Sequence, residues 1–135
     1  MKPEVMELAD RIRAAGGWRW LGIYAVGPTE ISLIGWSGPA APAHPRFPKD
    51  RGLCGAAAAT GAPVVVDDVA ADPRYLETLG TTRSEMVVPI KRATGEVVGL
   101  IDVESERRGA FSPEDVALLE EHAAIAAAQL WKSTR

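Results

Sequence analysis

The spacing of hydrophobic residues changes along this chain and predicts alternating helical and extended segments. Over residues 3–15, apolar positions recur every three or four residues, which predicts a helix that the glycines at 16–17 end. Over residues 18–26 the period falls to two, as in a strand with two distinct faces. A Gly-Pro turn at 27–28 then leads into a second strand over 30–36, so these segments predict a β-hairpin.

The middle of the chain contains two long stretches without periodicity. Residues 37–50 are rich in proline, and we expect a loop packed over the domain. Residues 51–61, with four consecutive alanines and a final glycine, predict a short helix, and residues 64–66 predict a buried strand. Residues 67–83 predict an irregular segment with one helical turn near Tyr75.

A second hairpin and a long helix complete the predicted order. Residues 85–90 and 96–104 form the hairpin strands, and Pro89, which lacks a backbone donor, predicts an edge or a bulge. A serine, a proline and two acids at 112–115 begin a helix that runs to about Lys132.

This order predicts an α+β fold in one domain, residues 1–135. Its antiparallel sheet has the terminal helices on one face. The long loops, 37–50 and 67–83, cover a pocket on the other face, because loops over a sheet commonly form binding sites.

Composition excludes several classes of protein. Hydrophobic residues make up 47% and charged residues 24%, as in globular domains. With a net charge of -3 and scattered lysines and arginines, we expect no nucleic-acid partner. There is no apolar run of membrane-spanning length, and the polar start does not resemble a signal peptide. A single cysteine, Cys54, cannot form an internal disulfide, so we expect a cytoplasmic protein.

The second hairpin contains the candidate chemistry. Asp102 and Glu104 are two residues apart and share a strand face, and Glu85 on the neighbouring strand can join them. The same alternation places Val98 with the acids and Val97 opposite. Buried acids repel one another unless a cation lies among them, and an ammonium group suits that position. Alternatively, the acids lie in water or pair with nearby arginines. Those arginines are Arg83, Arg107 and Arg108.

An aromatic cluster is the second candidate. Trp20, Gly22 and Tyr24 share a strand face, and the glycine leaves a hollow between two rings. With Trp36, this cluster can hold an apolar or cationic group. The alternative is ordinary core packing.

Other reactive residues give weaker signals. Cys54 lies at the start of the short helix, where a thiol pKa falls, although a buried and inert cysteine is the simpler interpretation. Asp67 and Asp68 have no third ligand nearby, and His44 and His122 lack metal-ligand spacing. With no nucleotide-binding fingerprint either, we expect no metal and no cofactor.

Six segments in order resemble the landmarks of GAF domains, most closely those of the free methionine-(R)-sulfoxide reductase branch. They are WLGIY at 20–24, RGLCG at 51–55, VDDV at 66–69, SEMVVPI at 84–90, GLIDVES at 99–105 and FSPED at 111–115. The resemblance covers nearly the whole chain. It implies that Glu85, Asp102 and Glu104 hold the ammonium of a free amino acid, the last being an aspartate in the reductases. It also implies an aromatic wall near Trp20 or Tyr24.

The resemblance fails at the cysteines. The reductases carry three, because a thiolate must attack the sulfoxide and a second thiol must resolve the sulfenic acid. Only the middle one is present, as Cys54, and the other positions fall near His44 and Thr78. Three hypotheses follow. The first is a non-catalytic module for a small amine ligand. The second is a reductase in which Cys54 acts with an external thiol. The third is an interaction module that forms a homodimer through its terminal helices, with Trp131 as an exposed anchor.

Overall fold

The computed structural model of the chain describes residues 1–132; the last three residues of the expected domain lie outside the described part. The helices are α1 (Pro3–Gly16), α2 (Gly52–Thr60) and α3 (Pro113–Leu130), with a 3-10 turn, η1 (Val69–Ala71). The strands are β1 (Trp20–Val26), β2 (Glu30–Ser37), β3 (Arg46–Pro48), β4 (Val64–Val66), β5 (Ser84–Lys91) and β6 (Val97–Ser105).

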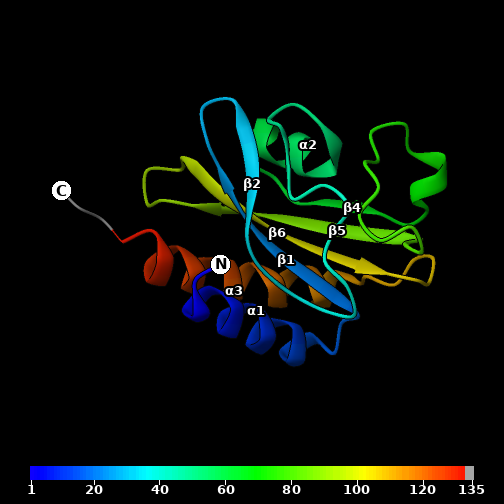
Figure 1. Cartoon of the computed structure of the whole chain (residues 1–135), viewed down its shortest axis with the longest axis horizontal. Coiled ribbons are helices and arrows are strands. Elements are labelled where there is room, and N and C mark those ends of the chain that lie inside the picture. Colours follow the sequence, from blue (N-terminus) through cyan, green and yellow to red (C-terminus); the bar gives the residue numbers. More distant parts are fainter. Residues whose placement is uncertain (133–135) are drawn as a thin grey trace.

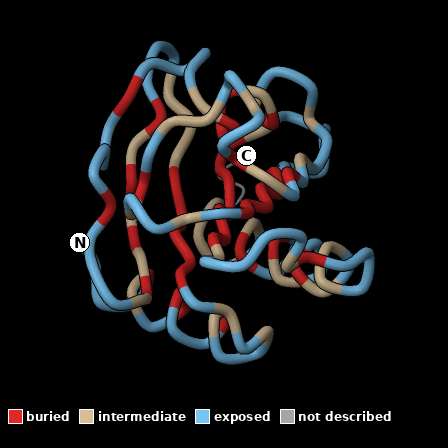
Figure 2. Tube along the Cα trace, turned by 90° about the vertical axis from the view of Figure 1, so that its right-hand side faces the viewer, coloured by how far each residue is buried: buried red, intermediate tan, exposed pale blue. Residues whose placement is uncertain are grey.

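One six-stranded sheet organises the domain. Its order is β3-β2-β1-β6-β5-β4, and every neighbouring pair is antiparallel. Helices α1 and α3 lie side by side beneath one face, while α2 and the long loops cover the other (Figure 1). The tube in Figure 2 shows buried positions gathered along the strands and exposed positions along the loops. The predicted α+β fold is confirmed.

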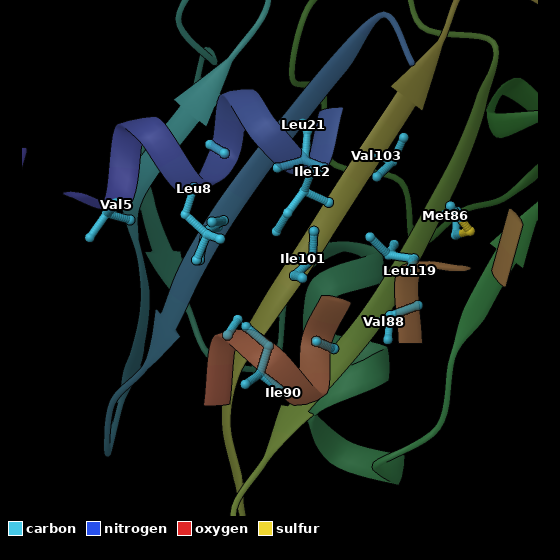
Figure 3. Packing of buried hydrophobic residues seen from close by; sticks show 14 of the residues in the cluster. Val5, Leu8, Ile12, Leu21, Met86, Val88, Ile90, Ile101, Val103 and Leu119 are labelled. Atoms are coloured by element: carbon cyan, nitrogen blue, oxygen red, sulfur yellow. The ribbon is translucent and has the colours of Figure 1, made fainter. Parts of the chain in front are cut away.

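The helix-covered face carries the larger part of the core. Leu8 and Ile12 of α1 and Leu119 of α3 are buried in one cluster with Ile101 and Val103 of β6 (Figure 3). Each such side chain stabilises the fold by about 1.5–3 kcal/mol through burial. This layer therefore holds β1 and β6 rigidly, and these strands position the residues of the opposite face.

The predicted start of the last helix is confirmed. The Ser112 hydroxyl accepts a hydrogen bond from the Asp115 amide at 3.2 Å. The Asp115 carboxylate in turn accepts one from the Ser112 amide at 2.9 Å. This reciprocal arrangement satisfies two amides that a helix start leaves unpaired, so local sequence alone fixes where α3 begins.

Two features of the long loops differ from the prediction. Residues 46–48 form β3, which pairs with β2 at Glu30–Ser32 and adds an edge strand. Three residues are too few to show a periodic pattern, so sequence cannot distinguish this strand from a loop. The expected helical turn near Tyr75 is wrong in position, because the turn η1 lies at Val69–Ala71 and the Asp68 carboxylate caps it.

A bulge near the start of β6 reverses the expected facing of two valines. Ile90 pairs with Gly99 but Lys91 pairs with Val97, which leaves Val98 unpaired between them. Val98 consequently packs in the helix-side cluster, and Val97 packs against the opposite one. The prediction for these two residues was wrong, because one extra residue inverts strict alternation.

The end of α3 does not present Trp131 as an exposed anchor. The Trp131 ring packs over Gly99, where an added Cβ would lie 2.6 Å from Cη2. Ile125 is instead the exposed large apolar residue of α3, at 52% exposure. Within the described residues, none of the helices is both long and apolar enough to cross a membrane.

Candidate functional site

Strand register brings the three predicted acids together. Glu85 of β5 lies opposite Glu104 of β6. Asp102 lies between Gly22 of β1 and Val87 of β5. Because residues two apart on a strand share a face, the carboxyl groups form one cluster on the side that α2 and the loops cover. We call Glu85, Asp102 and Glu104 the acidic triad.

The acidic triad is buried. Its members are 3%, 1% and 0% exposed, respectively. The Thr82 hydroxyl donates a hydrogen bond to Glu104 Oε1 at 2.7 Å. Hydrogen bonds also join the three acids to one another. One oxygen of each acid is nevertheless buried without a partner outside the triad; these atoms are Glu85 Oε1, Asp102 Oδ1 and Glu104 Oε2.

No arginine neutralises this cluster in the part of the chain that the structure describes. The ion pairs there join other acids, for example Arg108 to Asp68 at 3.8 Å and Arg19 to Glu106 at 2.9 Å. The interpretation that these acids lie in water or pair with arginines is therefore wrong. Three buried acceptor oxygens remain without a partner, and such oxygens favour a cation.

Burial and mutual repulsion shift the titration of the acidic triad. Burial first, and then the charge of Glu104, raises the pKa of Glu85 well above its usual value. Burial and then Glu85 raise the pKa of Asp102, and burial and then Asp102 raise the pKa of Glu104. The three groups therefore retain protons at a pH where exposed acids are ionised.

A small cavity opens beside the triad. It has a volume of about 10 Å³ for the centre of a water-sized group, enough for one water or one ammonium. Its walls include Glu85, Asp102, Tyr24 and Cys54, whereas Glu104 does not line it. A pocket is therefore present on the expected face, but it has room for only a single small group.

A larger groove lies immediately outside this cavity. The groove measures about 430 Å³ on the same scale and runs between α2 and the loop after η1. Gly52 and Leu76 line both spaces. An added Cβ on Gly52 would lie 3.2 Å from the Leu76 Cβ, so these two residues form the thin partition between groove and cavity.

Backbone hydrogen bonds tie the two roofing loops together. The Ala43 amide donates to the Thr78 carbonyl at 2.8 Å, and this bond joins residues 38–45 to residues 72–83. The Trp20 indole donates to the Ala40 carbonyl at 2.9 Å, which fastens the first loop to the sheet. The roof over the acids is consequently a single connected layer.

The three aromatic residues predicted to form one cluster lie in different places around the cavity. Tyr24 lines the cavity and contacts Phe47 edge-on, with ring centroids 5.8 Å apart. The rings of Trp20 and Tyr24 fill the space above Gly22, where an added Cβ would lie 2.5 Å from Trp20 Cη2. Trp36 is half-buried on the same face and does not line the cavity. The expected hollow is therefore occupied by the rings themselves.

Cys54 lies in the cavity wall and is buried. Burial first, and then the neighbouring Asp102, raises the pKa of its thiol well above the usual value. The acids thus oppose the activation that a helix start would give a thiol. His44 and Thr78, the positions that the resemblance pairs with two further cysteines, line the same cavity.

Several residues of the site gave no sequence signal. Thr82 supports Glu104, Leu76 separates the cavity from the groove, and Phe47 contacts Tyr24. All three come from the irregular loops or from the short strand β3. Their roles depend on tertiary contacts, which no local spacing rule describes.

With the fold and this buried site established, the class of the protein is clear. The chain matches the GAF domain family over residues 3–130 and belongs to it. Protein ZMO0507 of Zymomonas mobilis is 35% identical over 72% of this chain. The chain covers 59% of the length of that relative.

Free methionine-R-sulfoxide reductases are among the solved structures with the same fold. The type II free methionine-R-sulfoxide reductase from Thermoplasma acidophilum superposes with a TM-score of 0.84 at 30% identity, covering 92% of this chain and 87% of that one. The free methionine-R-sulfoxide reductase from Neisseria meningitidis, solved with its substrate, gives 0.80 at 37% identity, covering 90% and 72%. The chain is therefore similar to both enzymes over nearly all its length.

Proposed function

We propose that this GAF domain binds a small ligand through a cationic amine, which the acidic triad holds. One observation carries the proposal: three buried carboxyl groups each present an oxygen without a partner. A primary ammonium group has three N–H donors, which equals the number of free acceptor oxygens. Charge and hydrogen-bond number therefore both favour this guest.

The size of the small cavity also favours a ligand with a cationic amine. Its volume of about 10 Å³ suits the ammonium group alone. The remainder of the ligand requires the space beyond Leu76, where the outer groove begins. Binding therefore includes movement of Leu76 away from Gly52. A free amino acid or related amine fits this scheme, and relatives of known structure are named as reductases of free methionine-R-sulfoxide.

Electrostatics favour binding without catalysis. A reductase needs a thiolate, and the raised pKa of Cys54 keeps its thiol protonated near neutral pH. The other two positions that the resemblance assigns to cysteines hold His44 and Thr78. A single cysteine would also require an external thiol to resolve a sulfenic acid. An assay with free methionine-(R)-sulfoxide and a small thiol, with Cys54→Ser as control, tests that alternative; turnover that depends on Cys54 would establish it.

Calorimetry tests the binding proposal directly. The protein is titrated with free amino acids, including methionine and its sulfoxides, and with simple amines. Glu85→Gln and Asp102→Asn should each weaken binding at least about tenfold, because each removes a charge-assisted hydrogen bond of about 1.5–3 kcal/mol. Glu30→Gln, an exposed acid on β2, is the matched control and should bind normally. Equal affinity in all variants, or no binding of any amine by the parent, would refute the proposal.

A further inference from the structure

A thiol and two carboxyl groups from three different elements converge at the cavity. Cys54 of α2, Glu85 of β5 and Asp102 of β6 each offer one ligand atom, and these atoms all lie within 4.8 Å of one another. All three side chains are buried, with 5% exposure or less. The sequence prediction of no metal considered only neighbouring acids and the histidines, whereas this set forms only when the chain folds.

A second observation shows that this set is open to a cation. Glu85 Oε1 and Asp102 Oδ1 are buried without a partner outside the triad. Both residues line the small cavity together with Cys54. Among the described residues, no ion pair includes either acid. Oxygens removed from water in this way are stabilised by a positive charge that also coordinates directly.

We propose that Cys54, Glu85 and Asp102 form a binding site for a thiophilic divalent metal ion, with zinc as the expected occupant. Zinc binds cysteine as the thiolate and therefore displaces the proton of the Cys54 thiol; its bonds to sulfur and carboxylate oxygen are about 2.3 and 2.0 Å long in tetrahedral geometry. Magnesium and calcium prefer oxygen ligands alone, so the sulfur selects against them. These side chains supply three protein ligands, and a water molecule would complete the fourth position.

The metal site goes beyond the proposed amine site and shares two of its residues. A metal ion and an ammonium group would therefore compete for Glu85 and Asp102. Glu104, which Thr82 supports, belongs to the amine site alone. Cys54 would be a direct ligand of the metal, whereas its sulfur offers an ammonium group only a weak hydrogen-bond acceptor. A substitution at Cys54 thus separates the two proposals.

The test uses the whole chain, stripped of metal with a chelator, and titrates cobalt(II) as a spectroscopic probe. One equivalent should bind, with thiolate-to-cobalt charge-transfer absorption and the visible bands of a tetrahedral ion, and zinc should displace it. Cys54→Ser should abolish the charge-transfer band and weaken zinc binding more than about a hundredfold, which exceeds the roughly 10–100-fold loss usual for residues that only support a ligand. Asp102→Asn should weaken zinc binding similarly, whereas His122→Ala on α3 should not.

The possible results distinguish the metal site from the amine site. Absence of stoichiometric cobalt or zinc binding to the parent protein would overturn the metal site, and so would binding without a thiolate band. A thermal melt of each variant tests whether it is folded. If Cys54→Ser does not fold, the presence or absence of the thiolate-to-cobalt band in the spectrum of the parent protein tests the metal site. Amine binding that survives in Cys54→Ser while the metal spectrum is lost would support both sites. Amine binding by a parent protein that binds no metal would overturn the metal site alone.

Discussion

Replacing Asp102 with asparagine should stabilise the ligand-free domain while it weakens amine binding. Asp102 is 1% exposed, and one of its oxygens has no partner. The asparagine side chain has nearly the same shape, carries no charge and can donate to the neighbouring Glu85 carboxyl. Leaving a buried polar group unsatisfied costs about 1–3 kcal/mol and more when the group is charged, so removal of the Asp102 charge should give a gain of about that size near pH 8. For a domain of this length, that corresponds to about 3–10 °C in Tm.

The stability that Asp102→Asn gains should increase with pH. The pKa of Asp102 is raised by burial and by Glu85, so the folded protein binds its proton more tightly than the unfolded chain. The resulting stability is fully present below the unfolded pKa of about 3.9 and is lost as pH rises through the folded pKa. Asp102→Asn removes that loss, so the variant should gain more at pH 8 than at pH 5.

Thermal unfolding of metal-free and ligand-free protein at both pH values is the appropriate assay. Asp10→Asn is the matched control, because Asp10 is an exposed acid on α1. Its Tm should change little, since surface substitutions usually fall within about 0.5 kcal/mol. The reasoning would be refuted if Asp102→Asn were destabilising at pH 8, or if its effect were the same at both pH values.

Three further predictions concern the site and its surroundings. Amine affinity should increase as pH rises through the raised pKa values of the acidic triad. Calorimetry in buffers of different ionisation enthalpy should detect the protons that binding releases, and an affinity independent of pH would contradict this prediction. Gly99→Ala should lower stability by about 1–3 kcal/mol in denaturant titration, because the new Cβ would lie 2.6 Å from Trp131 and 2.7 Å from the Tyr24 carbonyl; an unchanged midpoint would refute that packing. Leu76→Ala should accelerate amine association in stopped-flow measurements, because it thins the partition at Gly52, and an unchanged rate would show that entry occurs elsewhere.

The acidic triad is the part of the site that sequence predicted well. Asp102 and Glu104 share a face because the strand period is two, and the hairpin register brings Glu85 opposite Glu104. Whether the acids were buried or exposed could not be decided from spacing, since that depends on α2 and the loops above them. The spacing of the acids did not by itself favour a binding site, whereas the resemblance to the reductases did.

Other features could not be predicted because they depend on single residues or distant contacts. Counted back from Glu104, strict alternation predicts the sheet face of each β6 residue correctly as far as Gly99. The bulge at Val98 then places the two preceding valines on the faces opposite to those predicted. Strand β3 has three residues and forms because β2 offers it a partner. Cys54 meets Asp102 only after α2 packs on the sheet, so the convergence of their ligand atoms is tertiary information.

The bond between the Ala43 amide and the Thr78 carbonyl has a consequence for how this domain would report its ligand. Displacing the segment that carries Leu76 and Thr78 pulls on the segment that carries Ala43, and that segment continues directly into β3 at the sheet margin. Ligand binding at the buried acids would thereby move the opposite edge of the sheet, at β3, without a change in the strands between. The margin at β3, rather than the helical layer, is where a change in occupancy would become visible to a neighbouring molecule.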